Sequence, residues 1–215
     1  MAHEIKNPLT PIRLTLDRLA EKVTAGAGVD AGTLSGSLDR MNEQVDALER
    51  LVDQFRSFSR DADVHCVPIG LRAAIEAVGA AMAGRAATHV TGDAVVHADP
   101  HLLNQVLLNL WKNAVEAGAD RIDVTAQSSA DAVTVVVRDN GCGIPAGKVE
   151  QVWLPYVTLK KGGTGLGLPV VRKLVELMGG QVHLTSRTGG PERGVCVTMR
   201  LLSGKGHGPG GTCEY

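Results

Sequence analysis

The chain has no excess of charge of either sign. Its 22 Lys and Arg residues nearly balance 23 Asp and Glu residues, which gives a formal net charge of -1 and a pI near 6.6. Nucleic acids are normally bound through a strongly basic surface, so the charge gives no reason to expect a nucleic-acid partner. Any phosphate-binding site must therefore be local.

Cysteines and long apolar runs are also scarce. The four cysteines, Cys66, Cys142, Cys196 and Cys213, form no CxxC pair, and no histidine stands near them at a metal-ligand spacing. This scatter favours a reducing, cytoplasmic setting over a disulfide framework or a zinc site. No apolar run reaches the roughly 18 to 20 residues that cross a bilayer. We expect a soluble fragment without membrane contact, although the complete protein can carry a membrane anchor upstream.

Hydrophobic residues repeat with alternating spacings of four and three in the N-terminal part of the chain. The two series are Ile5, Leu9, Ile12, Leu16, Leu19 and Val23, and then Leu34, Leu38, Met41, Val45, Leu48, Val52 and Phe55. They predict two helices joined by the glycine-rich break 25–32, with Thr33 capping the second helix. One hairpin buries little by itself, so we expect a homodimeric four-helix bundle. The alternative is a hairpin packed on its own C-terminal domain.

Helical and strand patterns alternate from Val67 onward. The predicted helices are 71–83, 100–117 and 170–178, and the predicted strands are 95–98, 121–126, 133–138, 182–186 and 195–201. This order predicts a two-layer α/β sandwich after the helical hairpin. We assign 1–62 to the hairpin, 63–203 to the α/β domain and 204–215 to a disordered, glycine-rich tail.

Two asparagines on the predicted helix 100–117 are candidates for metal binding. Asn109 and Asn113 lie one turn apart and share a face. Buried amides need partners, and Mg²⁺ with nucleotide phosphates would supply them because this ion takes oxygen ligands. Capping of neighbouring backbone is an equally good explanation of these two amides taken alone.

Two glycine-rich turns suggest a nucleotide pocket. Asp139 ends a predicted strand and could accept a hydrogen bond from an exocyclic amine such as that of adenine, while Gly141 and Gly143 would let the backbone approach a base. The turn 163–168 precedes a helix whose N–H groups could face phosphates, with Lys160 and Lys161 beside it. Taken alone, each turn could be an ordinary strand end or surface loop.

Near the start of the chain, His3 and Asn7 share one helical face and Glu4 lies about 100° round the helix. A neutral imidazole can accept a phosphoryl group while a carboxylate holds the proton on its other nitrogen. On spacing alone, an exposed histidine without a function is the simpler interpretation.

Taken together, these motifs resemble the sensor histidine kinases of two-component systems. HEIKNPL at 3–9 resembles their H box, NLWKNA at 109–114 their N box, DNGCGIP at 139–145 their G1 box and GTGLGL at 163–168 their G2 box. The longer string HEIKNPLTPI is most similar to the nitrogen-regulation, NtrY-like branch. The resemblance implies a dimerisation and histidine-phosphotransfer hairpin followed by an ATP-binding domain of Bergerat (GHKL) type.

The resemblance also implies a protein histidine kinase and the roles of its residues. Asp139 would bind adenine, Asn113 with help from Asn109 would hold Mg²⁺, and Lys160 and Lys161 would cover the phosphates of ATP. The glycine-rich turn would cover the phosphates as well, through Gly163, Thr164, Gly165, Leu166, Gly167 and Leu168. His3 would accept the γ-phosphoryl group with Glu4 as general base and pass it to an aspartate of a response-regulator receiver. Asn7 would orient a water that dephosphorylates this regulator.

Some residues depart from the family's usual pattern. Trp153 would replace an apolar plug in the phosphate-covering segment, Val195 stands where threonine is common, and Glu116 stands where lysine is frequent. Because the first turn of a helix frays, we expect autophosphorylation of His3 to be weakened more than ATP binding.

Two other classes of protein remain open from the sequence. A different GHKL-type ATPase would normally have a glutamate where Asn109 stands and would lack the histidine-bearing hairpin. A pure dimerisation scaffold would keep the hairpin but would not bind ATP.

Overall fold

The structure is a computed structural model of the 215-residue chain. It describes residues 64–82, 84–160 and 163–204 throughout, and residues 13–17, 19–21, 24, 32, 34–39, 41 and 45 nearer the N-terminus. The predicted site residues His3, Glu4, Asn7 and Lys161 lie outside the described residues. The chain forms two compact units, 1–60 and 61–215.

In the first unit, every described residue is helical, as the apolar spacing predicts. Gly32, the last residue of the expected break between the helices, is already helical, and Thr33, the predicted cap, lies outside the described residues. A glycine costs a helix only about 1 kcal/mol relative to alanine, too little to set a helix boundary by itself. In the part of the chain that the structure describes, no helix is both long and apolar enough to cross a membrane.

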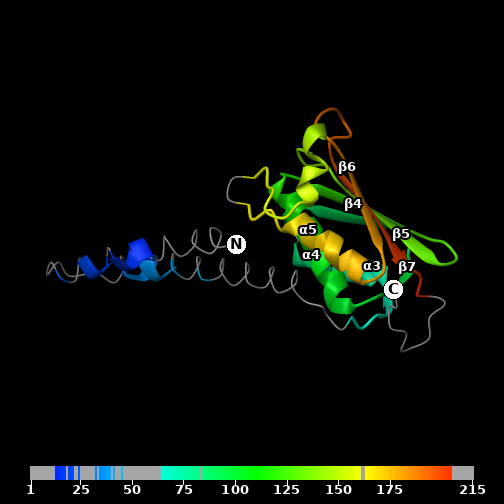
Figure 1. Ribbon diagram of the computed structural model, residues 1–215, viewed down its shortest axis with the longest axis horizontal. Helices are drawn as coiled ribbons and strands as arrows, with labels where there is room; N and C mark the ends of the chain where they lie inside the picture. Colours follow the sequence, from blue (N-terminus) through cyan, green and yellow to red (C-terminus); the bar gives the residue numbers. More distant parts are fainter. Residues whose placement is uncertain are drawn as a thin grey trace. The chain divides into compact units, whose positions relative to one another are not determined.

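The second unit combines helices and strands. Its elements are β1 (Val67–Gly70), α3 (Leu71–Ala81), β2 (Ala87–Thr91), β3 (Val95–Ala98), α4 (Pro100–Glu116), β4 (Arg121–Ser128), β5 (Ala132–Asp139), the 3-10 turns η1 (Ala146–Lys148) and η2 (Gln151–Trp153), α5 (Gly167–Leu177), β6 (Gln181–Arg187) and β7 (Gly194–Leu202). The helices α3, α4 and α5 lie together on one side of the main sheet (Figure 1).

The main sheet has five strands in the order β2-β4-β5-β7-β6. β2 runs parallel to β4, and the other neighbouring pairs are antiparallel. β1 and β3 form a separate two-stranded antiparallel sheet. A sheet with its helices on one face confirms the predicted two-layer α/β sandwich. The pairing of β5 with β7 brings the end of β5, where Asp139 lies, next to the start of β7 at Gly194.

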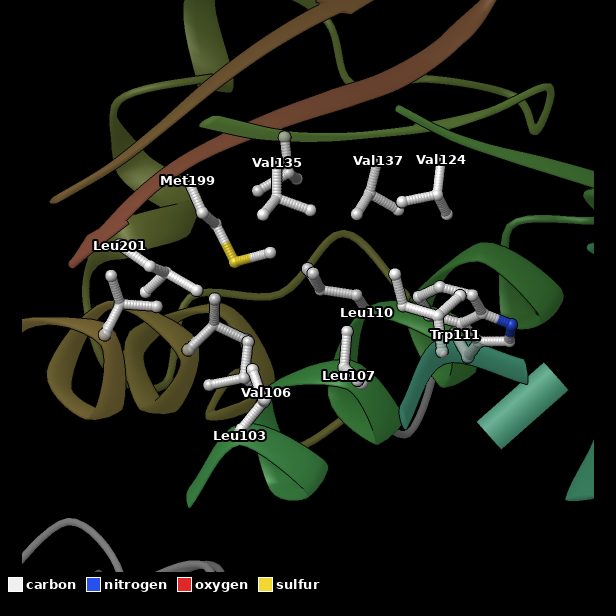
Figure 2. Close-up of a cluster of buried hydrophobic side chains, with 14 of the residues drawn as sticks. Leu103, Val106, Leu107, Leu110, Trp111, Val124, Val135, Val137, Met199 and Leu201 are labelled. Carbon is white, nitrogen blue, oxygen red and sulfur yellow. The ribbon is translucent and has the colours of Figure 1, made fainter. Parts of the chain in front are cut away.

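Helix α4 supplies the centre of the core. It begins with Asp99, whose Oδ1 accepts hydrogen bonds from the N–H groups of His101 and Leu102, followed by Pro100, whose missing N–H costs nothing in the first turn. Its apolar side chains face those of the sheet (Figure 2): Leu103, Val106, Leu107, Leu110 and Trp111 on the helix, and Val124, Val135, Val137, Met199 and Leu201 on the strands. All of these are at most 5% exposed, so the rotation of α4 about its axis is set by this layer.

The sequence did not predict β1 or β2, and it predicted the start of α5 three residues late. β2 is an edge strand whose exposed and half-buried residues alternate, and β1 contains Pro68 and is mostly exposed. Strands at an edge bury few apolar side chains, so their hydrophobic pattern is weak. The connection between the predicted strands 121–126 and 133–138 is also shorter in the structure, because Gln127 and Ser128 still pair with Thr134 and Val133.

Candidate functional site

The two asparagines of α4 lie on its side that faces the start of α5. Asn109 is 9% exposed, and its Nδ2 donates a hydrogen bond to the carbonyl oxygen of Gln105 at 2.9 Å. The Nδ2 of Asn113 is buried and has no hydrogen-bond acceptor among the described residues. Capping of backbone therefore accounts for Asn109 but leaves the amide of Asn113 unexplained.

Both asparagine side chains converge on Gly167, the first residue of α5. A Cβ built on Gly167 would lie 3.2 Å from Asn113 Nδ2, 3.4 Å from Asn113 Oδ1 and 3.6 Å from Asn109 Oδ1. A side chain at this position would therefore press on the Asn113 amide and touch the Asn109 amide at an ordinary contact distance. The first turn of α5, where backbone N–H groups lack helical partners, stands directly opposite two amide oxygens.

Lys160 brings a positive charge to the same place. Its Nζ lies 3.4 Å from Asn113 Oδ1, 3.3 Å from the carbonyl oxygen of Asn113 and 2.8 Å from Glu116 Oε2. Glu116 also forms a longer ion pair with Lys112, at 3.8 Å. The C-terminal turn of α4 thus holds an ammonium group at the negative end of the helix dipole.

Asp139 is held at the end of β5 by backbone donors. Its Oδ1 accepts hydrogen bonds from the N–H groups of Gly141 at 2.8 Å and Val195 at 3.2 Å, and neither bond uses Oδ2. Burial raises the pKa of this carboxyl above its ordinary value of 3.8, while the two backbone donors and the nearby Lys160 charge oppose that rise. The carboxylate is therefore oriented, partly desolvated and within electrostatic reach of Lys160.

The glycines around Asp139 are required by the protein's own packing. A Cβ on Gly141 would lie 2.9 Å from the Cβ of Ala117, and a Cβ on Gly143, which has φ 74°, would overlap the carbonyl oxygen of Arg187. At Gly194, with φ 129°, it would overlap the carbonyl oxygen of Asp139. These close approaches explain the glycines without a ligand, and they hold the Asp139 carboxylate in one position.

Side chains that the sequence analysis did not single out complete this turn. Asn140 Oδ1 accepts hydrogen bonds from the N–H groups of Asp120 and Arg121, both at 3.1 Å. Ser186 Oγ accepts one from Ile144 N–H at 2.7 Å and donates one to the carbonyl oxygen of Gly194 at 2.9 Å. A single serine in a strand carries no sequence signal, so only the sheet pairing could have revealed Ser186.

The glycine-rich turn contacts the segment that follows η2. Gly165 has φ 66°, and its carbonyl oxygen accepts a hydrogen bond from Tyr156 N–H at 3.1 Å. Tyr156 also has a positive φ, of 68°, which is strained for a residue with a side chain. Close by, Thr158 Oγ1 accepts a hydrogen bond from Lys160 N–H at 3.1 Å. These contacts fix the backbone that carries Lys160.

Trp153 and the leucines of the turn anchor this region to the core. Trp153 is 6% exposed, and the Arg172 guanidinium carbon lies 4.3 Å from the centre of its ring. Leu166 is 4% exposed, and Leu168 is partly buried against the core. The side chains of Leu166 and Leu168 therefore pack toward the core, Leu166 almost completely and Leu168 in part.

The structure thus places the side chains of Asn109 and Asn113 beside Gly167 and the ammonium of Lys160 against Asn113. It also places Asp139 within electrostatic reach of Lys160. Of the remaining predicted residues, Thr164 Oγ1 accepts a weak hydrogen bond from Leu166 N–H at 3.4 Å, and a Cβ on Gly163 would lie 2.5 Å from Thr158 Oγ1.

The second unit has the architecture of a GHKL-type ATPase domain. Residues 98–205 match the family described as histidine kinase-, DNA gyrase B- and HSP90-like ATPases, and residues 1–63 match the His Kinase A phospho-acceptor domain. Gyrase-like and HSP90-like ATPases share the first match, whereas the second match distinguishes the kinases. The chain belongs to the sensor histidine kinases of two-component systems.

Known relatives are similar along nearly the whole chain. The nitrogen regulation protein NtrY of Azorhizobium caulinodans is 33% identical over 97% of this chain and 28% of its own length. The sensor histidine kinase ZraS of Escherichia coli is 34% identical over 88% of this chain and 42% of its own length. The chain therefore spans less than half the length of these curated relatives.

Solved structures share the fold. The histidine kinase ThkA, in complex with the response regulator protein TrrA, is 26% identical, with a TM-score of 0.73 over 94% of this chain and 59% of that one. The Acinetobacter baumannii histidine kinase AdeS is 20% identical, with a TM-score of 0.70 over 94% of this chain and 98% of that one. At 20% identity, AdeS supports the fold alone.

Proposed function

We propose that the chain binds ATP and Mg²⁺ in its second unit, transfers the γ-phosphoryl group to His3 and passes it to an aspartate of a response-regulator receiver. The observation that carries this proposal is the convergence of two amide oxygens on the first residue of α5, together with an ammonium that contacts one of them. Phosphoryl transfer depends mainly on positioning and charge neutralisation, which such an arrangement supplies.

The adenine side of the site is assigned to Asp139. Since Oδ1 is taken up by two backbone N–H groups, Oδ2 is left to accept a hydrogen bond from the exocyclic amine of adenine. Gly141 borders this carboxylate, and Gly143 follows it in the same turn. Partial burial strengthens a hydrogen bond to the ionised carboxylate because water competes less for it.

The phosphate side is assigned to α4, Lys160, Lys161 and the turn 163–168. The residues fit a magnesium ion: Asn113 Oδ1 already faces a cation, and its buried Nδ2 would gain a phosphate oxygen as acceptor. Asn109 Oδ1 stands beside it as a second oxygen. The ion would supply charge neutralisation between the phosphates, a role that needs only one or two protein oxygens.

The histidine chemistry is assigned to the first unit. His3 is the proposed acceptor: its ring nitrogen forms the new bond to phosphorus as the bond to ADP breaks, and Glu4 takes the ring proton. Asn7 would orient the water that hydrolyses the phosphorylated regulator. The match of residues 1–63 to the phospho-acceptor domain supports this assignment. Accordingly, we assign 1–62 to the hairpin, 63–203 to the ATP-binding domain and 204–215 to a tail.

A homodimer, a receiver partner and a cytoplasmic location for this catalytic core complete the proposal. Four residues of the predicted apolar series are 42–51% exposed in the single chain: Leu16, Leu34, Leu38 and Val45. A second copy would cover them in a four-helix bundle. The receiver partner rests on the family and on the structure of ThkA, which was solved in complex with a response regulator protein. The relatives are longer than this chain, and we expect the complete protein to be a membrane-anchored sensor.

The test is incubation with γ-labelled ATP and Mg²⁺. We expect acid-labile, base-stable label on the wild type, none on His3→Gln, and full labelling of His101→Gln, which removes an exposed histidine at the start of α4. Equal labelling of His3→Gln would contradict the assignment. No label on any variant, together with no rise in Tm on adding ADP and Mg²⁺, would favour the dimerisation scaffold. Turnover of ATP without label would favour another GHKL-type ATPase.

A further inference from the structure

The ammonium of Lys160 contacts Asn113 Oδ1, the amide oxygen that we assign to the metal. Lys160 Nζ lies 3.4 Å from Asn113 Oδ1 and is paired with Glu116 Oε2 at 2.8 Å. A magnesium ion takes its oxygen ligands at about 2.0 to 2.1 Å. An ion bound to Asn113 Oδ1 would therefore lie within a few ångströms of the ammonium, and the two positive charges would repel each other.

Lys160 can leave this position without disturbing the fold. Its backbone is held by Thr158 Oγ1, whereas its side chain is 35% exposed and that of Glu116 is 41% exposed. An ion pair at this exposure is weak, so the side chain can turn away at little cost. Glu116, placed where the family often has a lysine, gives the ammonium its shortest contact.

We propose that Lys160 acts as a resident cation in the metal-free chain, that Glu116 is the positioning residue that holds it against Asn113, and that a divalent cation must displace it. This proposal rests on the proposed function. Displacement frees the ammonium for the nucleotide phosphates at the moment the metal arrives. The ammonium thus leaves Asn113 Oδ1 as the metal ion binds there. The Asn113 amide has a cation beside it both with and without the metal.

The test observes the side-chain amide of Asn113 directly by NMR, in protein with ¹⁵N-labelled asparagine. Its signal is assigned by its loss in Asn113→Ser. MgCl₂ alone is then titrated into the wild type, Lys160→Met and Lys112→Met, with NaCl at matched ionic strength as the reference. Lys112→Met is the matched control, because the Lys112 ammonium also pairs with Glu116 but, within the described part of the chain, donates no hydrogen bond to the Asn113 side chain.

We expect Lys160→Met to shift the Asn113 amide signal in the metal-free chain and to lower the half-saturating Mg²⁺ concentration by about fivefold, the size of a partly exposed ion-pair contact. Lys112→Met, with the same change in charge, should alter that concentration less than about twofold. Glu116→Gln should shift the metal-free signal in the same direction as Lys160→Met.

The outcomes separate this inference from the proposed function. If Lys160→Met leaves the metal-free signal unmoved, or if the wild type and Lys160→Met need the same Mg²⁺ concentration, the resident-cation proposal is wrong while the metal site stands. If neither Mg²⁺ alone nor Mg²⁺ with ADP moves the Asn113 signal in any variant, the metal assignment of the proposed function fails, and the exchange fails with it.

Discussion

At the scale of single residues, the two oxygens of Asp139 have different environments. Oδ1 accepts hydrogen bonds from Gly141 N–H and Val195 N–H, which join two parts of the chain 56 residues apart. Oδ2 takes part in neither bond. The carboxylate is thereby held in one orientation, so its behaviour toward a ligand can be predicted atom by atom.

Replacing Asp139 by asparagine should weaken ADP binding about 10- to 100-fold, the usual loss of one hydrogen bond to a charged group. The new amide would keep its oxygen on the two backbone donors, which turns its NH₂ group toward the adenine amine, donor against donor. Isothermal titration calorimetry measures the affinity, and the Tm of the free chain should change little. Asp123→Asn, at an exposed pair with Arg121, serves as the control and should bind normally.

The raised pKa of Asp139 predicts how nucleotide affinity depends on pH. Burial disfavours the ionised form, so the folded chain keeps this proton over a range above 3.8 in which the unfolded chain has lost it. Ionisation of Asp139 therefore costs stability, and this cost appears as the pH rises through the folded-state pKa. Because the adenine amine needs the ionised carboxylate, ADP affinity should fall as the pH drops through that same pKa.

Calorimetry across the acid range checks this prediction. The loss of affinity should begin above the pH at which an ordinary aspartate titrates, and the residual affinity of Asp139→Asn should lack this step. A wild-type affinity that stays constant down to the ordinary aspartate pKa would contradict the assignment of Asp139 to adenine.

At the scale of elements, the start of α5 and the segment after η2 act as one structure. Gly165 and Tyr156 both have positive φ angles and are joined by a backbone hydrogen bond of 3.1 Å. Trp153 anchors the preceding turn beneath Arg172. Lys160 extends from this structure to α4, so its position depends on the backbone on both sides.

Gly165→Ala should disturb this structure and weaken binding of ADP with Mg²⁺ several-fold. The new Cβ would lie 2.6 Å from the carbonyl carbon of Tyr156 at a φ of 66°, and such strain costs about 1 to 3 kcal/mol. Gly147→Ala is the matched control, because a Cβ there meets nothing within 4 Å. Equal affinities for the two variants, measured by calorimetry, would argue that the turn does not contact the nucleotide.

The elements differ in how far the sequence predicts them. Helix α4 was predicted to within one residue at its end, because its cap and apolar repeat involve residues at most four positions apart. β2 was missed, since its partner β4 begins 30 residues after β2 ends and its own residues bury little. Among the candidate site residues, glycines and asparagines were found from their spacing, whereas Ser186 and the Lys160–Glu116 pair depend on contacts between distant segments.

At the scale of the whole molecule, the exposed leucines of the first unit predict its assembly. Leu16 and Leu14 are equally exposed in the single chain, at 51% and 52%, but only Leu16 belongs to the repeating apolar series. Their exposure in the single chain therefore does not distinguish the two leucines. In the proposed dimer, Leu16 would be buried and Leu14 would stay in water.

Leu16→Asp should convert a dimer into a monomer, because the charge would enter the apolar seam between two copies. Leu14→Asp should leave the dimer intact. Light scattering after size-exclusion chromatography measures the mass of each variant across a concentration series. A monomeric wild type, or equal dissociation of both variants, would instead favour a hairpin covered by its own chain.

Local spacing was enough to predict the helical N-terminal part and most of the helices and strands that follow it, and the resemblance to a known family gave the four motifs of a histidine kinase. Helix periodicity and turn chemistry act between residues a few positions apart, so a linear sequence displays them directly. The contact of Lys160 with Asn113 and Glu116 joins residues 47 and 44 positions apart, and no local pattern predicts it. The bond between Asp139 and Val195 likewise depends on the register of β5 and β7. Such pairings arise only when the tertiary fold brings distant segments together.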